Sequence, residues 1–211
     1  MVDFGSGFGG TSRFLVENGV AFVSCVDLSS HENTESRKTI HDLDLGLSIS
    51  NPFNRSYTDT GEPSESYHLI VSQDALLHAG EFREFSIKEA SRLLKKDGIL
   101  CFNDSMMSDN IEDLSVLKPV LERLNLANLS SVNTYKTWGA KYGLEFVEFV
   151  DFTKMAMETH YENVRLEMIS RGDELGLSKA FQERQNDGLK HWVSLAKSGH
   201  LSWGYLVFKK F

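Results

Sequence analysis

Long apolar runs are missing from this chain. No stretch of about 18 consecutive apolar residues occurs, so the sequence offers no candidate for a membrane-spanning helix. The N-terminus also lacks the basic region and apolar core that mark a signal peptide. These absences predict a cytoplasmic protein with no membrane partner.

Positive charge is in the minority. Lys and Arg number 22 against 30 Asp and Glu, which gives a formal net charge of -8. A field of that sign does not attract nucleic-acid backbones, so we expect no nucleic-acid partner. No repeat or low-complexity segment occurs, and 41% apolar content over 211 residues fits a single domain covering the whole chain. We expect no metal site.

Glycine is concentrated near the start, where residues 2–10 read VDFGSGFGG. A short apolar strand breaks there into a glycine-dense turn, and a helix is expected over 11–18. Gly5, Gly7 and Gly10 allow positive φ and a close approach to a ligand, and the free N–H groups at the helix start favour a polar or anionic group. The pattern predicts a nucleotide-binding turn.

Two cofactor classes use such a turn. Gly5-x-Gly7-x-x-Gly10 satisfies the dinucleotide fingerprint, and Asp27 lies 17 residues beyond Gly10, near the place of a ribose-binding acid. Asp3, two residues before the first glycine, together with the run GSGFGG, resembles motif I of the class I S-adenosylmethionine-dependent methyltransferases. The spacing leaves both cofactors open, and the acid with its glycine run favours S-adenosylmethionine.

Strands and helices alternate over the first hundred residues. After the glycine turn, strands are expected over 21–26, 67–71 and 99–102, with a short one at 47–50, and helices over 30–43 and 82–94. This order predicts an α/β fold with a doubly wound, mostly parallel sheet, in which ligands collect at the carboxyl ends of the strands. Further helices are expected over 116–124, 132–142, 158–169 and 180–196. Two late strands, 144–150 and 201–208, fit an antiparallel C-terminal pair and not the second parallel half that a dinucleotide enzyme needs.

The segment SQDALLH, residues 72–78, narrows the chemistry. Asp74 is expected to begin the helix after the fourth strand, with His78 four residues later on the same helical face, so that both point toward one pocket. A carboxylate can hold an ammonium group, and an imidazole can take a proton so that a nitrogen lone pair is free to attack. A helix-capping Asp above a packed His is the structural alternative.

The segments SQDALLHAG, KKDG, CFND and HWVSLAKSGHLSWG resemble the sarcosine/dimethylglycine N-methyltransferases of betaine synthesis. SQDALLH is also similar to a segment of phosphoethanolamine methyltransferases, in which the matching Asp contacts the substrate amine and the matching His belongs to the catalytic dyad. The resemblance covers nearly the whole chain and is poorest over 33–65. It implies the methyltransferase fold, S-adenosylmethionine as cofactor and a small amine as substrate.

The site residues that follow from the motifs and the resemblance fall into three groups. The cofactor-binding candidates are Asp3, Gly5, Ser6, Gly7, Gly10, Asp27, Leu28 and Gln73. The catalytic candidates are Asp74 and His78. The acceptor-pocket candidates are His160, Tyr161, Trp192, His200 and Trp203, with Trp192 and Trp203 as a cage for a methylated ammonium or as plain core aromatics. No motif identifies the adenine contact.

The resemblance also implies features outside the site. Relatives carry additional residues before Val2, including a helical lid over the cofactor, so we expect this chain to lack that lid and to turn over weakly. In the methyltransferase strand order, Cys25 and Cys101 lie three strands apart, or roughly 14 Å, too far for a disulfide. A monomer or a homodimer is expected.

Three alternatives to an amine methyltransferase remain open at this point. A non-catalytic relative would bind the cofactor without turnover. A nicotinamide-dependent oxidoreductase would use the same glycine turn for NAD. Methylation at oxygen, sulfur or carbon is also compatible, because the fold serves many acceptors.

Overall fold

The structure, a computed structural model, describes all residues from 1 to 211. The chain forms two compact units. The first consists of Met1–Asp104, Thr134–Phe149 and Leu206–Phe211, and the second of Ser105–Asn133 and Val150–Tyr205. The single domain expected over residues 1–211 stays a prediction.

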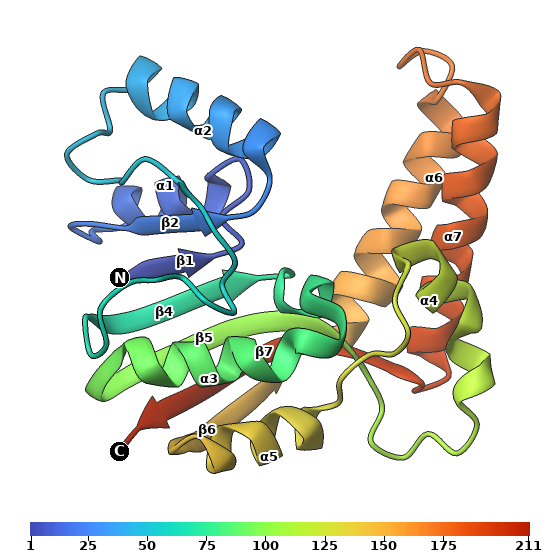
Figure 1. Cartoon of the computed structure of the whole chain (residues 1–211). Helices are drawn as coiled ribbons and strands as arrows, with labels where there is room; N and C mark the ends of the chain where they lie inside the picture. Colours follow the sequence, from blue (N-terminus) through green and yellow to red (C-terminus); the bar gives the residue numbers. More distant parts are fainter. The chain divides into compact units, whose positions relative to one another are not determined.

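The helices and strands alternate through the first half of the chain, as the sequence pattern predicted (Figure 1). In chain order the elements are β1 (Val2–Phe4), α1 (Gly10–Glu17), β2 (Ser24–Asp27), α2 (Ser30–Asp42), β3 (Phe53–Asn54), β4 (Tyr67–Gln73), η1 (Leu76–Phe82), α3 (Arg83–Leu93), β5 (Leu94–Met107), η2 (Leu114–Leu117), α4 (Lys118–Leu124), α5 (Val132–Lys141), β6 (Leu144–Asp151), η3 (Lys154–His160), α6 (Tyr161–Arg171), α7 (Lys179–Lys197) and β7 (Leu201–Lys210). The segments η1 and η2 are 3₁₀ helices, and η3 is a π-helix.

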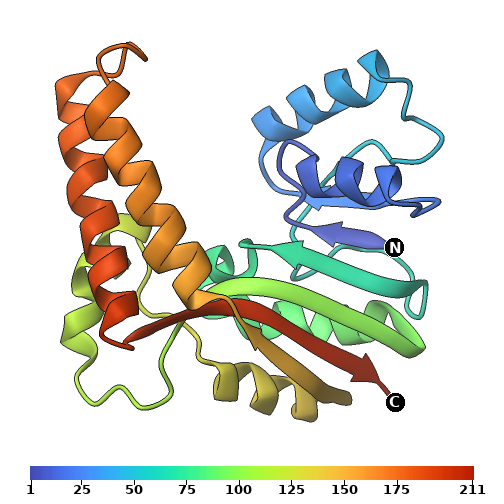
Figure 2. The same ribbon diagram turned by 180° about the vertical axis from the view of Figure 1, so that it is seen from behind.

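The strands form one seven-stranded sheet in the order β3-β2-β1-β4-β5-β7-β6. The pairs β3–β2, β2–β1, β1–β4 and β4–β5 are parallel. The strand β7 runs in the opposite direction to β4 and β5, as both views show (Figures 1 and 2). The predicted doubly wound, mostly parallel sheet with antiparallel C-terminal strands is therefore confirmed.

The first unit packs a helix layer on each face of the sheet. On one face the Ser12 hydroxyl of α1 lies 2.7 Å from a carboxylate oxygen of Asp3 and 3.2 Å from the Cys25 sulfur. Side chains alternate along a strand, so Phe102 points to the other face. There it makes an edge contact with Tyr135 of α5, with ring centroids 4.9 Å apart, and stacks on Phe208 at 6.1 Å. This layering leaves the strand ends to form the site.

The second unit contains the helices α6 and α7, which lie side by side in both views (Figures 1 and 2). Trp192 of α7 is buried and packs edge-on against Tyr161 of α6 at 6.0 Å. Arg165 joins the two helices, because its guanidinium donates to Asn186 of α7 at 3.0 Å while it pairs with Glu162 of its own helix at 2.6 Å. None of the chain's helices is both long and apolar enough to cross a bilayer.

Two departures from the expected element boundaries concern the strands. The third strand is Phe53–Asn54, whereas the expected segment 47–50 contributes only an isolated bridge from Ile49 to Val23. Residues 95–98, which separate the expected helix 82–94 from the expected strand 99–102, lie inside β5; there the pairing with β4 shifts register between Tyr67 and Leu69, and Asp97 takes a left-handed φ of 63°. At both places the backbone conformation depends on pairing with a strand that is distant in the sequence, which a local pattern does not reveal.

Both cysteines are free, as predicted. Cys25 lies in β2 and Cys101 in β5, and the strands β1 and β4 separate them in the sheet. The expected distance of three strand steps is therefore confirmed.

Candidate functional site

A cavity of about 380 Å³ lies at the carboxyl ends of β1, β2 and β4. Its volume falls in the range of about 300–1,000 Å³ that is usual for small-molecule sites. The lining residues are Gly5, Gly7, Asp27, Leu28, Ser29, Glu32, Tyr57, Gln73, Asp74, Ala75 and His78. Seven of the ten predicted cofactor and catalytic residues therefore meet in one cavity.

The glycine turn brings its backbone close to the cavity. Gly5 has a φ of 72° and Gly7 a φ of 50°, conformations that disfavour any residue with a Cβ. A Cβ on Gly5 would also overlap the Ala75 side chain. The third residue with positive φ is Gly9, at 77°, and not Gly10, which instead begins α1 and does not line the cavity.

Asp27 holds the turn from the neighbouring strand. One carboxylate oxygen accepts the Gly7 N–H at 2.9 Å, and the other accepts the Ser29 N–H at 2.7 Å. Ser29 in turn caps α2, because its hydroxyl accepts the Glu32 N–H at 3.2 Å. The carboxylate therefore fixes both the glycine turn and the start of α2 while it lines the cavity.

Asp3 and Ser6 lie beneath the turn instead of lining the cavity. Both are buried, and Asp3 accepts a hydrogen bond from the Ser12 hydroxyl at 2.7 Å. Burial, aided by the nearby Asp27 charge, raises the pKa of Asp3 to about 6 even though the Ser12 hydrogen bond opposes the rise. Their direct contact with a cofactor stays a prediction.

Gln73 is the last residue of β4, and Asp74 follows it directly; both line the cavity. The Thr11 hydroxyl, in the first turn of α1, donates to the side-chain amide oxygen Oε1 of Gln73 at 2.6 Å. Asp74 takes a left-handed φ of 48°, and its N–H donates to the Asn103 main-chain oxygen at 3.2 Å. Few non-glycine residues adopt this conformation, and those that do are often found at functional sites.

The expectation that Asp74 begins an α-helix is wrong in detail. Asp74 precedes a 3₁₀ helix that starts at Leu76 and is kinked at Gly80, where φ is 59° and ψ is -124°. The left-handed Asp74 cannot continue into a helix, so the four-residue helical spacing does not relate it to His78. Both side chains nevertheless line the same cavity.

A second buried acid lies at the end of β5. Asp104 is fully buried and accepts a hydrogen bond from the Tyr135 hydroxyl. Burial raises the pKa of Asp104 to about 7, with a smaller upward contribution from the Asp74 charge. Asp74 is thus the more exposed of two neighbouring acids at the carboxyl end of the sheet.

Four residues that line the cavity are not marked by any motif in the sequence. Ser29 and Glu32 belong to the start of α2, and Tyr57 and Ala75 lie on either side of β4. Tyr57 is the only aromatic residue between Phe53 and Tyr67, and this is the one signal that could have drawn attention to it.

The acceptor-pocket candidates all belong to the second unit. Tyr161 contacts both His160 and Trp192, with ring centroids 6.0 Å apart in each pair. Trp203 of β7 packs on the rings of Phe152 and Tyr205. The remaining candidate, His200, pairs through its ring with the Ser198 hydroxyl at 2.5 Å. Their contact with an acceptor stays a prediction.

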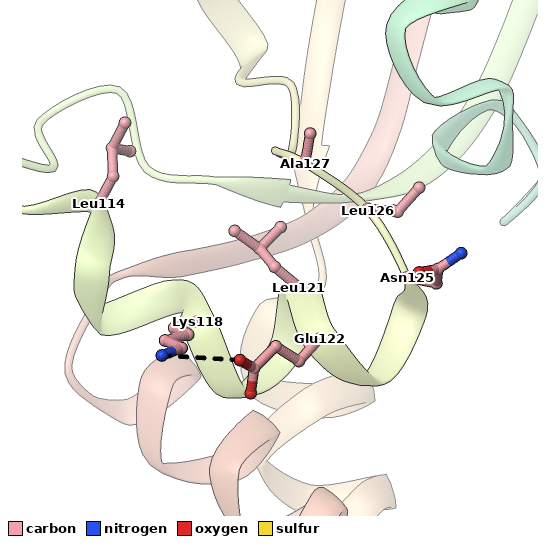
Figure 3. A pocket seen from close by; sticks show the side chains of 7 residues that line it. All are labelled: Leu114, Lys118, Leu121, Glu122, Asn125, Leu126 and Ala127. Carbon is pink, nitrogen blue, oxygen red and sulfur yellow. Dashed lines mark ion pairs between the residues drawn. The ribbon is translucent and has the colours of Figure 1, made fainter.

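Two further hollows occur in the second unit. One of about 740 Å³ is lined mainly by apolar side chains of α6 and α7, with His160 at its edge. The other, of about 460 Å³, lies along η2 and α4 (Figure 3). Its charged side chains, Lys118 and Glu122, form an exposed ion pair at 3.7 Å. Neither hollow has the glycine turn that borders the cavity in the first unit.

Comparison with known proteins identifies the fold's family. A methyltransferase domain family matches residues 2–102. The chain is 34% identical to the sarcosine/dimethylglycine N-methyltransferase of Aphanothece halophytica, over 100% of this chain and 75% of the relative. It is 36% identical to the dimethylglycine N-methyltransferase of Parasynechococcus marenigrum, over 100% of this chain and 74% of the relative.

A solved structure leads to the same family. A crystal structure from Galdieria sulphuraria, described as a candidate sarcosine dimethylglycine methyltransferase, superposes with a TM-score of 0.92 and 30% sequence identity. The match covers 99% of this chain and 77% of that chain. The choice that the glycine spacing left open between two cofactors is thereby resolved. The chain belongs to the class I S-adenosylmethionine-dependent methyltransferases, and S-adenosylmethionine is its methyl donor.

Proposed function

We propose that the protein methylates the nitrogen of a small amine of the sarcosine or dimethylglycine type, a reaction of betaine synthesis. The proposal is supported by two relatives named for these acceptors, each matched over the whole chain at 34% and 36% identity. The observation that carries it is the cavity in which Asp74 and His78 lie beside the glycine turn.

The residues of the cavity fit S-adenosylmethionine. Gly5 and Gly7 leave the backbone open where a Cβ would stand, which permits close approach of a nucleoside. Asp27 and Glu32 place carboxylates in the wall, where acids can accept hydrogen bonds from ribose hydroxyls. Gln73 and Asp74 are the polar residues at the β4 end. When bound, the cofactor supplies an electrophilic methyl group on a positively charged sulfur.

Asp74 and His78 would act on the acceptor. The Asp74 carboxylate can hold an ammonium group by charge and hydrogen bonding. The His78 imidazole is exposed and can take the proton that a protonated amine must lose before its lone pair attacks. The left-handed backbone conformation of Asp74 holds its carboxylate at the end of β4. The protein therefore contributes the orientation of the acceptor and a negative charge beside it.

An acceptor screen tests the proposal. The protein is incubated with S-adenosylmethionine and, separately, glycine, sarcosine, dimethylglycine, phosphoethanolamine, and representative alcohol, thiol and carbon acceptors. Methylated products are identified by mass spectrometry. We expect product with sarcosine or dimethylglycine. Product only with an oxygen, sulfur or carbon acceptor, or cofactor binding without product, contradicts the proposal.

Two substitutions test the roles of the acidic and basic groups. Asp74→Asn is expected to lower kcat/KM for the amine by roughly tenfold to a hundredfold, because hydrogen bonds to charged groups contribute about 1.5–3 kcal/mol. His78→Asn is expected to lower kcat by about a hundredfold, the lower end of general-base contributions. His41 and Asp42, an exposed pair 3.3 Å apart on α2, provide matched controls. Equal effects in the controls would contradict the assigned roles.

A further inference from the structure

Tyr57 lies in the loop between β3 and β4, in the stretch with the least recognisable sequence pattern. It is nevertheless 9% exposed and lines the cofactor cavity. Its ring stacks on Phe4 of β1, with centroids 6.0 Å apart and planes at 22°. Its hydroxyl donates a buried hydrogen bond of 2.7 Å to the main-chain oxygen of Ala75. Burial raises the pKa of the Tyr57 phenol, so it remains a donor at neutral pH.

Ala75 is the residue directly after Asp74, and the two form a tightly enclosed corner. Asp74 is held in a left-handed conformation, and its N–H is bound to the Asn103 carbonyl at 3.2 Å. The Ala75 side chain presses against Gly5, where no Cβ could be accommodated. The Tyr57 hydroxyl holds the other side of the same residue. A strained backbone conformation persists only where the surrounding structure fixes it in this way.

The loop that carries Tyr57 is itself anchored to α3. Buried Glu89 accepts hydrogen bonds from the Thr60 N–H at 2.9 Å and the Thr60 hydroxyl at 2.6 Å. Arg92 binds the same carboxylate at 2.7 Å and also donates to the Glu62 carbonyl. Burial alone would raise the pKa of Glu89, but the hydrogen bonds from Arg92 and Thr60 outweigh it and lower the pKa. The carboxylate therefore stays charged, and Tyr57 projects from a fixed loop.

We propose that Tyr57 is a positioning residue for methyl transfer: its hydroxyl holds the Asp74–Ala75 corner so that the Asp74 carboxylate faces the acceptor amine. The proposal rests on the proposed function, because it gives Asp74 the acceptor contact. The Tyr57 ring has a separate role, because it forms one wall of the cofactor cavity. Loss of the hydroxyl should therefore affect the reaction of the acceptor, and loss of the ring should affect binding of the cofactor.

Tyr57→Phe and Tyr57→Leu separate these two parts. Tyr57→Phe keeps the ring and leaves the Ala75 oxygen buried without its donor, so we expect kcat/KM for the amine to fall about tenfold. Affinity for S-adenosylhomocysteine, measured by calorimetry, should stay within about twofold of the wild type because the wall is intact. Tyr57→Leu removes the aromatic wall and should lower that affinity as well.

Tyr67→Phe is the matched control. The Tyr67 hydroxyl donates to Glu62 at 3.2 Å at the other end of the same loop and does not reach the cavity. We expect it to leave kcat/KM unchanged. The proposal is overturned if Tyr57→Phe leaves kcat/KM unchanged. It is also overturned if Tyr67→Phe lowers kcat/KM equally, or if Tyr57→Phe loses cofactor affinity in parallel with kcat/KM.

A readout independent of turnover separates this inference from the proposed function. Amide hydrogen exchange is measured over residues 72–78 and over the glycine turn in the protein with S-adenosylhomocysteine. Tyr57→Phe should speed exchange at 72–78 and leave the glycine turn unchanged. Equal exchange in both proteins refutes the positioning role even if no amine is methylated, whereas wild-type inactivity on all amines refutes only the proposed function.

Discussion

Replacing Asp3 with Asn should change how stability depends on pH. Burial raises the pKa of Asp3 from 3.8 to about 6 in the folded protein. Below pH 3.8 both the folded and the unfolded chain hold this proton, so the group contributes nothing to stability. As pH rises from 3.8 to about 6, the unfolded chain releases the proton first, and stability falls. Above about pH 6 the full cost remains.

The size of this cost follows from the two pKa values. The difference between 3.8 and about 6 corresponds to about 3 kcal/mol in the free energy of unfolding. At pH 4.5 about 1 kcal/mol of it is already present, which leaves a change of about 2 kcal/mol between pH 4.5 and 7.5. Because Asn cannot ionise, the free energy of unfolding of Asp3→Asn lacks this change with pH. Any contribution of the new amide facing Ser12 is independent of pH and cancels in the comparison.

Urea unfolding of Asp3→Asn and the wild type at pH 4.5 and 7.5, followed by tryptophan fluorescence, measures the effect. The free energy of unfolding of the variant minus that of the wild type should be about 2 kcal/mol larger at pH 7.5 than at pH 4.5. Asp42→Asn, at an exposed position of α2, is the control and should show no such change. A difference between Asp3→Asn and the wild type that is the same at both pH values would show that folding does not raise the pKa of Asp3.

Two further predictions concern the frame of the cavity. Gly5→Ala should weaken S-adenosylhomocysteine binding at least tenfold in calorimetry, because φ is 72° and the new Cβ would overlap Ala75; Gly46→Ala, in open space, should bind normally. Glu89→Ala should lower the free energy of unfolding by about 2 kcal/mol in urea titrations, because it leaves the buried Thr60 donors without an acceptor. Glu35→Ala, at an exposed ion pair, should leave the free energy of unfolding nearly unchanged. Equal costs for the two glutamates would contradict the anchoring role.

Much of the fold could be predicted because the sequence signals are local. The glycine turn, the apolar strand segments and the helix caps each act within a few residues, and parallel strands place their carboxyl ends at one edge. That is why Asp27 at the end of β2 meets Gln73 and Asp74 at the end of β4 in one cavity.

The remaining features depend on contacts between distant residues. Tyr57 lines the cavity from a loop that is anchored to Glu89, which lies 29 residues from Thr60 in the sequence. Motif spacing alone could not tell whether Gly9 or Gly10 takes the left-handed conformation. The burial of Asp3 beneath the turn likewise depends on Ser12, which α1 brings over the strand.

A crystal structure with S-adenosylhomocysteine bound would show directly where the cofactor lies. We expect density for the nucleoside in the cavity of about 380 Å³, against Gly5, Gly7 and Asp27, with the sulfur turned toward Asp74 and His78. An empty cavity at saturating ligand, or the nucleoside bound elsewhere, would contradict this expectation.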